Sequence, residues 1–313
     1  MTCELIAECC QNHNGSREIL KRMIHAAAEA GAKYAKIQAL RSSELTFRER
    51  FEEGQVLADG TTTVIKRPFQ AEQDRLKKLD LSDDDEFWFV EECKRAGIKS
   101  MITVFTRFST ERMVAAGFDA VKIASYDCRS TSLLQEVAEK FKTVVVSTGA
   151  SFDNEIFDAA KIFNKDQVLF LHCVTIYPTP LDQLHMNRMG WLRQLSSKVG
   201  FSDHTTPATT NLKASMLAIA LEADVVERHF TVLEPNETRD GPVSVNPSQL
   251  RELCTFAKIP RESRIEKLSA DWPEWEIGLG QQTRDLSATE LLNRDYYSGR
   301  VAAWCDGQQI SNQ

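Results

Sequence analysis

The stretch TVVVSTGASFDNEIFDAAKIFNKDQVLFLH, residues 143–172, contains one complete unit of a repeating pattern. Its two ends, TVVVS and VLFLH, are short apolar runs rich in β-branched and aromatic residues, as is typical of buried strands. Between them, the segment NEIFDAAKIF places apolar residues at helical spacing. A strand, a helix and a second strand in this order predict two parallel neighbouring strands joined by a helical crossover.

The same alternation extends over most of the chain and gives eight strands. We predict strands at residues 4–8, 34–38, 100–105, 120–125, 143–147, 168–172, 199–202 and 225–229. The segments 16–31 and 82–97 begin with a serine and end with a glycine, which favours capped helices. Eight strand–helix units match the count and length of a (β/α)8 TIM barrel. An open doubly wound sheet is the alternative, but no G-x-G-x-x-G sequence follows the first strand.

Two regions interrupt this alternation. Residues 39–81 form a long, charged insertion after the second predicted strand, and a loop of this length is usually functional or mobile. After residue 260 the pattern ends, and we expect residues 261–313 to form an extended tail that packs through Trp272, Trp275 and Trp304. The predicted organisation is a barrel domain over residues 1–260, followed by this tail.

The composition argues against several classes of protein. The 313 residues carry a formal net charge of -7 and show no basic stripe, so we expect no nucleic-acid binding. No apolar run approaches the roughly 20 residues of a membrane span, and the N-terminus lacks the features of a signal peptide. The eight cysteines are scattered without a C-x-x-C pair, which argues against a disulfide framework or a zinc ribbon. We therefore expect a cytoplasmic protein without a membrane partner.

Polar and aromatic side chains follow the predicted strands, and the carboxyl ends of the strands are where a barrel of this kind places its chemistry. In chain order these side chains are Glu8; Lys36 and Gln38; Thr106 and Phe108; Lys122, Ser125 and Asp127; Ser147; Thr175 and Tyr177; Ser202 and His204; and Glu227 and His229. All of them are candidates for one shared site.

Two lysines and two histidines in this set point to a particular chemistry. Lys36 and Lys122 lie in runs that we interpret as interior strands, where an unpaired charge is costly, so each needs an anionic partner. With the hydroxyl groups around them, they suit a phosphate and a carboxylate. His204 and His229 follow consecutive strands and suit a shared divalent metal ion with open positions for substrate. We interpret His172 instead as a packed interior residue.

The motifs that carry these residues resemble a known family. IAECCQNHNG, AKIQ, VKIAS, VSTG, LHCVTIYPTP, GFSDHT and VERHF stand in the order and spacing of the sialic acid synthase family, over residues 4–258. Members of that family condense phosphoenolpyruvate with an N-acylated aminohexose to form nonulosonic acids. The resemblance implies a TIM barrel, a transferase activity that forms a carbon–carbon bond, and a divalent metal, Mn²⁺ or Mg²⁺.

The resemblance also implies roles for individual residues. The metal ligands match His204 and His229, and the acidic residue that handles the attacking water matches Glu8. The phosphate contacts match Lys36, Thr106, Lys122 and Ser125; the carboxylate contacts match Ser147 and Ser202, with Thr175 where the family has an asparagine; the sugar contacts match Gln38, Asp127 and Tyr177. Phe108 is a further candidate contact with the substrate. We take Glu8, Lys36, Lys122 and Asp127 as the catalytic candidates.

The sequence departs from the family at several positions. Asp127 stands where many members carry a longer glutamate, and Asp240, in TRDGPVS, is the candidate for the family's sugar-binding aspartate. Members usually carry a C-terminal antifreeze-like domain that caps the partner subunit's site and contributes an arginine. Residues 298–313 resemble only the opening of that domain, with Arg300 as a stand-in for the arginine. We therefore expect a homodimer whose site is completed by residues 39–81, by the tail or by the second subunit.

Two other functions stay open on this sequence. An aldolase or a 3-deoxy sugar acid synthase on the same barrel would act on a phosphorylated sugar and would need a second basic cluster, for which Arg107 is the candidate near a strand end. A non-catalytic relative would bind a ligand or a partner chain without turning it over. The metal and phosphate residues are all present, which argues against this last reading.

Overall fold

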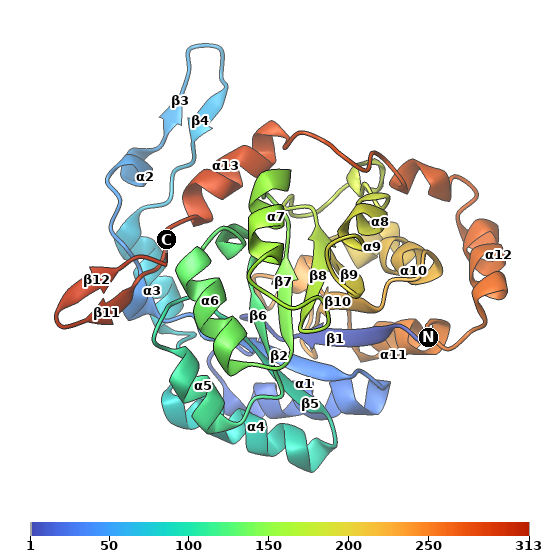
Figure 1. Cartoon of the computed structure of the whole chain (residues 1–313), viewed down its shortest axis with the longest axis horizontal. Helices are drawn as coiled ribbons and strands as arrows, with labels where there is room; N and C mark the ends of the chain where they lie inside the picture. Colours follow the sequence, from blue (N-terminus) through green and yellow to red (C-terminus); the bar gives the residue numbers. More distant parts are fainter. Residues whose placement is uncertain (1, 313) are drawn as a thin grey trace.

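Eight parallel strands close into a barrel in the computed structural model, which describes residues 2–312 (Figure 1). Their bounds are β1 (Glu4–Glu8), β2 (Tyr34–Gln38), β5 (Lys99–Val104), β6 (Ala120–Ile123), β7 (Val144–Ser147), β8 (Val168–Cys173), β9 (Lys198–Asp203) and β10 (Val225–His229). They follow one another around the barrel in this order, and β10 pairs with β1 to close it. The TIM barrel predicted from the sequence is confirmed.

Helices cover the outside of the barrel and fill the segments between the strands. They are α1 (Arg17–Ala30), α4 (Asp83–Ala96), α5 (Thr110–Ala116), α6 (Thr131–Lys140), α7 (Asp153–Ala160), α8 (Arg188–Leu192), α9 (Pro207–Thr210), α10 (Lys213–Ala220) and α11 (Pro247–Phe256). The side chains of Ser16 and Ser82 cap the N-termini of α1 and α4, and Gly31 and Gly97 end these helices in the left-handed conformation. Both predicted caps are confirmed. None of the described helices has the length and apolar character needed to cross a lipid bilayer.

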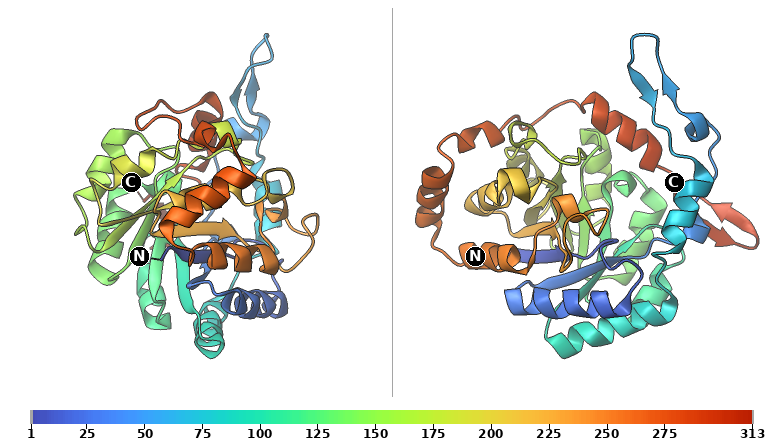
Figure 2. Two further views of the ribbon diagram at one scale, coloured as in Figure 1. Left: turned by 90° about the vertical axis from the view of Figure 1, so that its right-hand side faces the viewer. Right: turned by 180° about the vertical axis from the view of Figure 1, so that it is seen from behind.

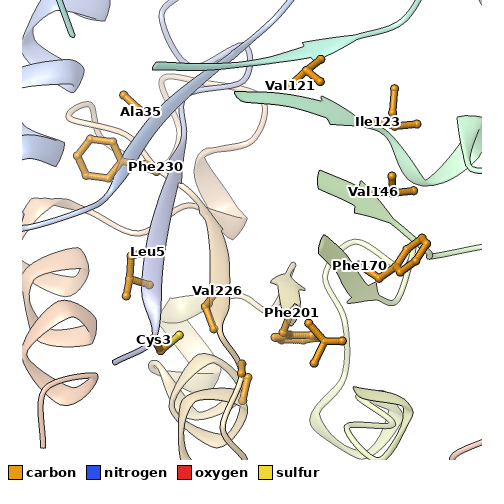
Figure 3. Packing of buried hydrophobic residues seen from close by; sticks show 14 of the residues in the cluster. Cys3, Leu5, Ala35, Val121, Ile123, Val146, Phe170, Phe201, Val226 and Phe230 are labelled. Atoms are coloured by element: carbon orange, nitrogen blue, oxygen red, sulfur yellow. The ribbon is translucent and has the colours of Figure 1, made fainter. Parts of the chain in front are cut away.

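Successive side chains of a strand point to opposite faces of the barrel wall, and this alternation gives one apolar core outside the barrel and one inside it. Side chains on the outer face of the barrel, among them Leu5, Val121 and Phe201, pack against the helices (Figure 3). Side chains of the opposite parity, such as Ile6 and Leu171, fill the interior of the barrel. Positions two residues beyond these interior side chains also point inward, and at the carboxyl ends of the strands they are polar or charged. The interior core therefore ends in a polar layer at the barrel mouth.

The insertion after β2 is folded. It contains η1 (Ser42–Glu44), α2 (Arg50–Glu53), the antiparallel pair β3 (Gln55–Val56) and β4 (Thr62–Val64), and α3 (Phe69–Lys77). The β3–β4 hairpin projects away from the barrel (Figures 1 and 2). Phe51 and Val64 form a small apolar cluster with Tyr296 of the tail. The insertion and the tail are thus packed on each other.

The tail differs from the extended chain that we expected. It contains α12 (Arg261–Asp271), η5 (Trp275–Gly278), α13 (Ala288–Tyr297) and a hairpin of β11 (Ala303–Cys305) and β12 (Gln308–Ile310). A capping box of Ser287 and Glu290 begins α13, a local signal that fixes a helix start without strand–helix alternation. Trp272 packs in the main core as expected, whereas Trp304 is 56% exposed.

The last part of the tail runs over the carboxyl ends of the strands (Figure 1). Asn293 of α13 donates a hydrogen bond of 2.8 Å to the carbonyl of Thr175, just after β8. Asn312 donates one of 2.6 Å to the carbonyl of Phe105, just after β5. The tail and the barrel mouth of the same chain are therefore in direct contact.

Candidate active site

Four charged side chains meet inside the barrel mouth. Glu8, Lys36, Lys122 and Glu227 come from four strands and are all buried. Lys36 forms an ion pair with Glu8 and lies 3.5 Å from a Glu227 oxygen. Lys122 forms an ion pair with the other oxygen of Glu227. The anionic partners that the two lysines require are thus carboxylates of the chain itself.

The two lysines differ in how their donors are used. An ammonium group has three N–H donors. Lys36 faces Glu8, Glu227 and the hydroxyl of Thr103, which it reaches at 3.0 Å. Lys122 has Glu227 as its hydrogen-bond partner among residues 2–312. Lys122 consequently keeps donors available for an anionic ligand, whereas Lys36 has its ion pair with Glu8 and its hydrogen bond to Thr103.

Burial and pairing shift the pKa values in this cluster in opposite directions. Burial lowers the pKa of Lys36 to about 7, although Glu227 opposes the shift. Burial would raise the pKa of Glu227, but Lys122 and Lys36 outweigh it and hold that pKa well below its usual range. Glu227 is therefore held as an anion, and burial makes it easier for Lys36 to lose a proton.

The two histidines of the predicted metal site lie side by side. The ring centroids of His204 and His229 are 5.3 Å apart, and burial lowers the pKa of both, so the imidazoles are neutral. Nδ1 of His229 is buried and has no hydrogen-bond partner among residues 2–312. Neutral imidazoles with an unpartnered nitrogen fit a divalent metal ion.

A second group of possible ligands lies next to His229. Donor atoms of Cys10, His229 and Asp240 all lie within 4.8 Å of one another. The thiol of Cys10 donates a hydrogen bond of 2.9 Å to Asp240. His204 is outside this triad, and its Nδ1 lies 3.7 Å from the sulfur of Cys173. The ring of Tyr177 lies against His204, with centroids 4.4 Å apart.

The hydroxyl groups of the predicted site fall into two kinds. Oγ of Ser147 and Oγ1 of Thr175 are buried without hydrogen-bond partners among the described residues. Ser202 donates to Glu227 at 2.8 Å, and Thr106 donates to Glu44 of the insertion at 3.1 Å. Ser125 is buried at the start of η2 (Ser125–Asp127), which follows β6, the strand of Lys122. Only the unpartnered hydroxyls are free to bind a ligand without breaking a bond.

Asp127 is held by the tail. It accepts hydrogen bonds from Ser130 at 2.9 Å and from Asn312 at 3.2 Å, and burial raises its pKa to about 6. It lines a small pocket together with Tyr126, stacked on Tyr297 of α13, and Arg300. Arg300 forms an ion pair with Glu72 of the insertion. This pocket is built by the barrel and the tail together.

Phe108 lies apart from the cluster, at the protein surface. Phe108 is 49% exposed, with the guanidinium of Arg107 over its ring, and its backbone N–H donates to Glu136. Gln38 is half-buried at the end of β2. The structure thus brings together Glu8, Lys36, Lys122, Ser202 and the two histidines, and it places Phe108 on the surface.

His172 packs outside the barrel interior. Its Nε2 lies 2.6 Å from the carbonyl of Leu184, and its ring packs against Phe201. The interpretation of His172 as a packed residue is confirmed. It has the opposite parity to Cys173, whose side chain faces the mouth beside His204.

Two functional candidates, Cys10 and Glu44, were missed in the sequence. Glu227 stood among the strand-end candidates without an assigned role, and alternation along the strand that it shares with His229 places both side chains in the interior. Cys10 and Glu44 carry no comparable signal, because a turn and an irregular insertion bring them to the site.

The structure is a closed (β/α)8 barrel of the TIM class, with a buried lysine–glutamate cluster and paired histidines at its mouth. The chain belongs to the NeuB family, whose model matches residues 23–265.

Named relatives agree with this assignment. N,N'-diacetyllegionaminic acid synthase of Legionella pneumophila is 29% identical over 263 residues, which cover 81% of this chain and 70% of the relative. Human N-acetylneuraminate-9-phosphate synthase is 27% identical over 313 residues, which cover 96% and 78%. The crystal structure of N-acetylneuraminic acid synthetase from Leptospira borgpetersenii, in complex with citrate, has a TM-score of 0.69 at 25% identity and covers 95% of this chain and 91% of that one. The chain is therefore homologous to nonulosonic acid synthases.

Proposed function

We propose that the chain is a nonulosonic acid synthase, which joins phosphoenolpyruvate to an N-acylated aminohexose and releases phosphate. The observation that carries this proposal is the buried cluster of Lys36, Lys122, Glu8 and Glu227 beside His204 and His229. Positive donors and neutral imidazoles at one barrel mouth suit an anionic substrate next to a carbonyl substrate. The kinship with named synthases supports the same reaction class.

Lys122 and two hydroxyl groups are the expected contacts with phosphoenolpyruvate. Lys122 has donors that its pairing with Glu227 leaves unused, and they suit the phosphate. Ser147 and Thr175 have buried, unpartnered hydroxyls that suit the carboxylate of the same substrate. Lys36 pairs with Glu8 and lies 3.5 Å from a Glu227 oxygen, so its expected role is to hold these two carboxylates in place.

His204 and His229 would hold the divalent metal that the family uses. When bound, such an ion supplies a Lewis acid that polarises the aldehyde oxygen of the open-chain sugar. The histidines are neutral and buried, so they bind a cation without first losing a proton.

The proposed reaction forms one carbon–carbon bond and breaks one carbon–oxygen bond. C3 of phosphoenolpyruvate attacks the aldehyde carbon, whose oxygen gains a proton and becomes a hydroxyl. The cationic centre left at C2 is attacked by water, and Glu8, an acidic side chain paired with Lys36 at the barrel mouth, is the proposed acceptor of the proton that this water loses. The C2–O bond then breaks, so phosphate leaves with the former bridging oxygen and water supplies the C2 oxygen of the product.

Phosphate release from phosphoenolpyruvate tests the proposal. The full-length protein is incubated with phosphoenolpyruvate, Mn²⁺ and a panel of N-acylated hexosamines, with Lys122→Met as the matched control. We expect sugar-dependent phosphate release that the variant lacks. Binding of phosphoenolpyruvate without release for any sugar would favour the non-catalytic reading, and carbon–carbon bond formation without phosphoenolpyruvate would favour an aldolase.

A phosphorylated acceptor is a second candidate, which a basic depression favours. Arg48, Arg50, Arg129 and Arg294 line it between the insertion, α13 and the loop after η2, with Asp295 as its acidic residue. Nε of Arg48 is buried without a hydrogen-bond partner among residues 2–312. We propose it as the second basic cluster that a phosphosugar needs, in which Arg50 pairs with Asp295 and Arg294 with Glu155.

The acceptor panel separates the two cases. It includes each hexosamine with and without a terminal phosphate, and Arg50→Gln removes one exposed arginine of the depression. If the acceptor is phosphorylated, the KM for the phosphosugar should rise in this variant, and the KM for the unphosphorylated sugar should not change. An unphosphorylated acceptor predicts equal KM values in the variant and the parent protein.

We also propose a cytoplasmic location. Seven of the eight cysteines are buried as free thiols, and Cys305 is free and partly exposed. Free thiols persist in a reducing compartment.

A further inference from the structure

Cys10 occupies an unusual position directly after β1. Its φ of 43° lies in the left-handed region, where glycine is the least costly residue. Its backbone N–H donates a hydrogen bond of 2.7 Å to Glu8, and its side chain is buried. A cysteine held in a strained conformation at a barrel mouth suggests that the thiol itself is used.

The thiol points to residues that can bind a metal. The pairing of β1 with β10 places Glu8 opposite His229, so the turn at Cys10 lies against that histidine. Donor atoms of Cys10, His229 and Asp240 are mutually within 4.8 Å, and Sγ of Cys10 is 2.9 Å from an Asp240 oxygen. His229 is only 8% exposed, and its Nδ1 has no partner among residues 2–312. That buried, unpartnered nitrogen is evidence for a ligand that is independent of the cysteine.

We propose that Cys10 is a thiolate ligand of the divalent metal, together with His229 and Asp240, and that the site therefore prefers a borderline ion such as Zn²⁺ or Co²⁺ over Mg²⁺. The inference rests on the proposed function in placing a metal at His229. On binding, the metal replaces the proton between sulfur and carboxylate, and that proton leaves to solvent. No oxidation or reduction takes place.

The ligand set decides the preference. Thiolate and imidazole ligands favour Zn²⁺ and its neighbours, whereas Mg²⁺ takes oxygen ligands and keeps several waters. A site with histidines alone lacks the sulfur that separates these ions most strongly. The single residue Cys10 thus sets which metal this chain selects.

Cobalt spectroscopy tests the proposal without any substrate. Co²⁺ bound to a thiolate has an intense sulfur-to-metal charge-transfer absorption in the near ultraviolet, which nitrogen and oxygen ligands do not give. The matched variants are Cys10→Gly, which suits the positive φ, and Cys173→Ser, which removes the other thiol of the mouth. Calorimetry measures Co²⁺, Zn²⁺ and Mn²⁺ affinity for each protein.

We expect the charge-transfer band in the parent protein and in Cys173→Ser, and its loss in Cys10→Gly. Zn²⁺ affinity should fall on the order of 10-fold to 100-fold in Cys10→Gly, and Mn²⁺ affinity much less. Co²⁺ binding without the band, or a band lost only in Cys173→Ser, overturns the role of Cys10 and leaves the proposed function intact. No Co²⁺ binding by the parent protein overturns the inference as well, and phosphate release then tests the proposed function separately.

Discussion

Lys122 and Glu227, 105 residues apart in the chain, form an ion pair inside the barrel mouth. Each lies on an interior position of its strand. Both side chains are buried, so water cannot take the place of the missing partner when one of them is removed. The pair would couple the stability of the barrel to the proposed binding of phosphoenolpyruvate, because Lys122 takes part in both.

Removal of Lys122 should show this coupling. Lys122→Met leaves Glu227 with only the more distant Lys36 as a cationic partner, and we expect the free energy of unfolding to fall by about 3 kcal/mol. The double variant Lys122→Met/Glu227→Met should recover most of that loss. Urea denaturation measures both. Phosphate release should be absent in both, and a double variant no more stable than the single one would contradict a direct pairing.

Replacement of His229 and replacement of His172 by alanine should have opposite effects on metal binding and on stability. His229→Ala removes a ring with an unpartnered nitrogen, so we expect loss of metal binding and of phosphate release with little change in stability. His172→Ala leaves the buried carbonyl of Leu184 without its partner and should cost about 1–3 kcal/mol of stability while metal binding persists. Calorimetry and thermal denaturation separate the two effects. Full activity of His229→Ala in the presence of a chelator would exclude the metal site.

Asp127 should make the stability depend on pH. Burial raises its pKa from 3.8 to about 6, so between these pH values the folded protein holds a proton that the unfolded chain has lost. This contribution is intact below about pH 3.8, and stability falls as the pH rises towards 6. Comparison of Tm across this range should show a smaller decline in Asp127→Asn. Asn312→Ala removes a hydrogen bond that favours the charged form and should steepen the decline.

The tail should affect the sugar more than phosphoenolpyruvate. A deletion that begins at residue 286 leaves Trp272 in the core, whereas one that begins at 270 would remove it. The shorter deletion should raise the KM for the sugar, because it removes Tyr297 and Arg300 from the pocket of Asp127. Steady-state kinetics and sedimentation measure activity and the expected homodimer. A monomeric protein with unchanged kinetics would show that neither the tail nor a tail-mediated dimer completes the site.

The parts of the site that lie on strands could be predicted from the sequence. Strand parity and the carboxyl-end rule place Glu8, Lys36, Lys122 and His229 at one mouth from local pattern alone. Contacts that depend on the path of an irregular segment could not be predicted in this way. The bond from Asn312 to Asp127 joins residues 185 positions apart, and no periodicity reports it.

The helices of the tail were missed for a related reason. Their signal is a cap rather than an alternation: Ser287 and Glu290 begin α13, and Arg284 pairs with Glu290. Cap signals of this kind are short and occur often in loops, so they decide a helix only when the segment also finds a packing partner. The insertion provides that partner, because its Phe51 packs on Tyr296 of α13.

The bond between Asn312 and Asp127 also has a practical consequence for handling the protein. Asn312 lies beside the barrel mouth, so a fusion partner or affinity tag that follows it closely would compete with the proposed sugar for space. A tag that closely precedes Glu4 would lie at the amino end of β1, the end away from the mouth. Immobilisation through the N-terminus therefore leaves the mouth open to solution, and immobilisation through the C-terminus turns it towards the support.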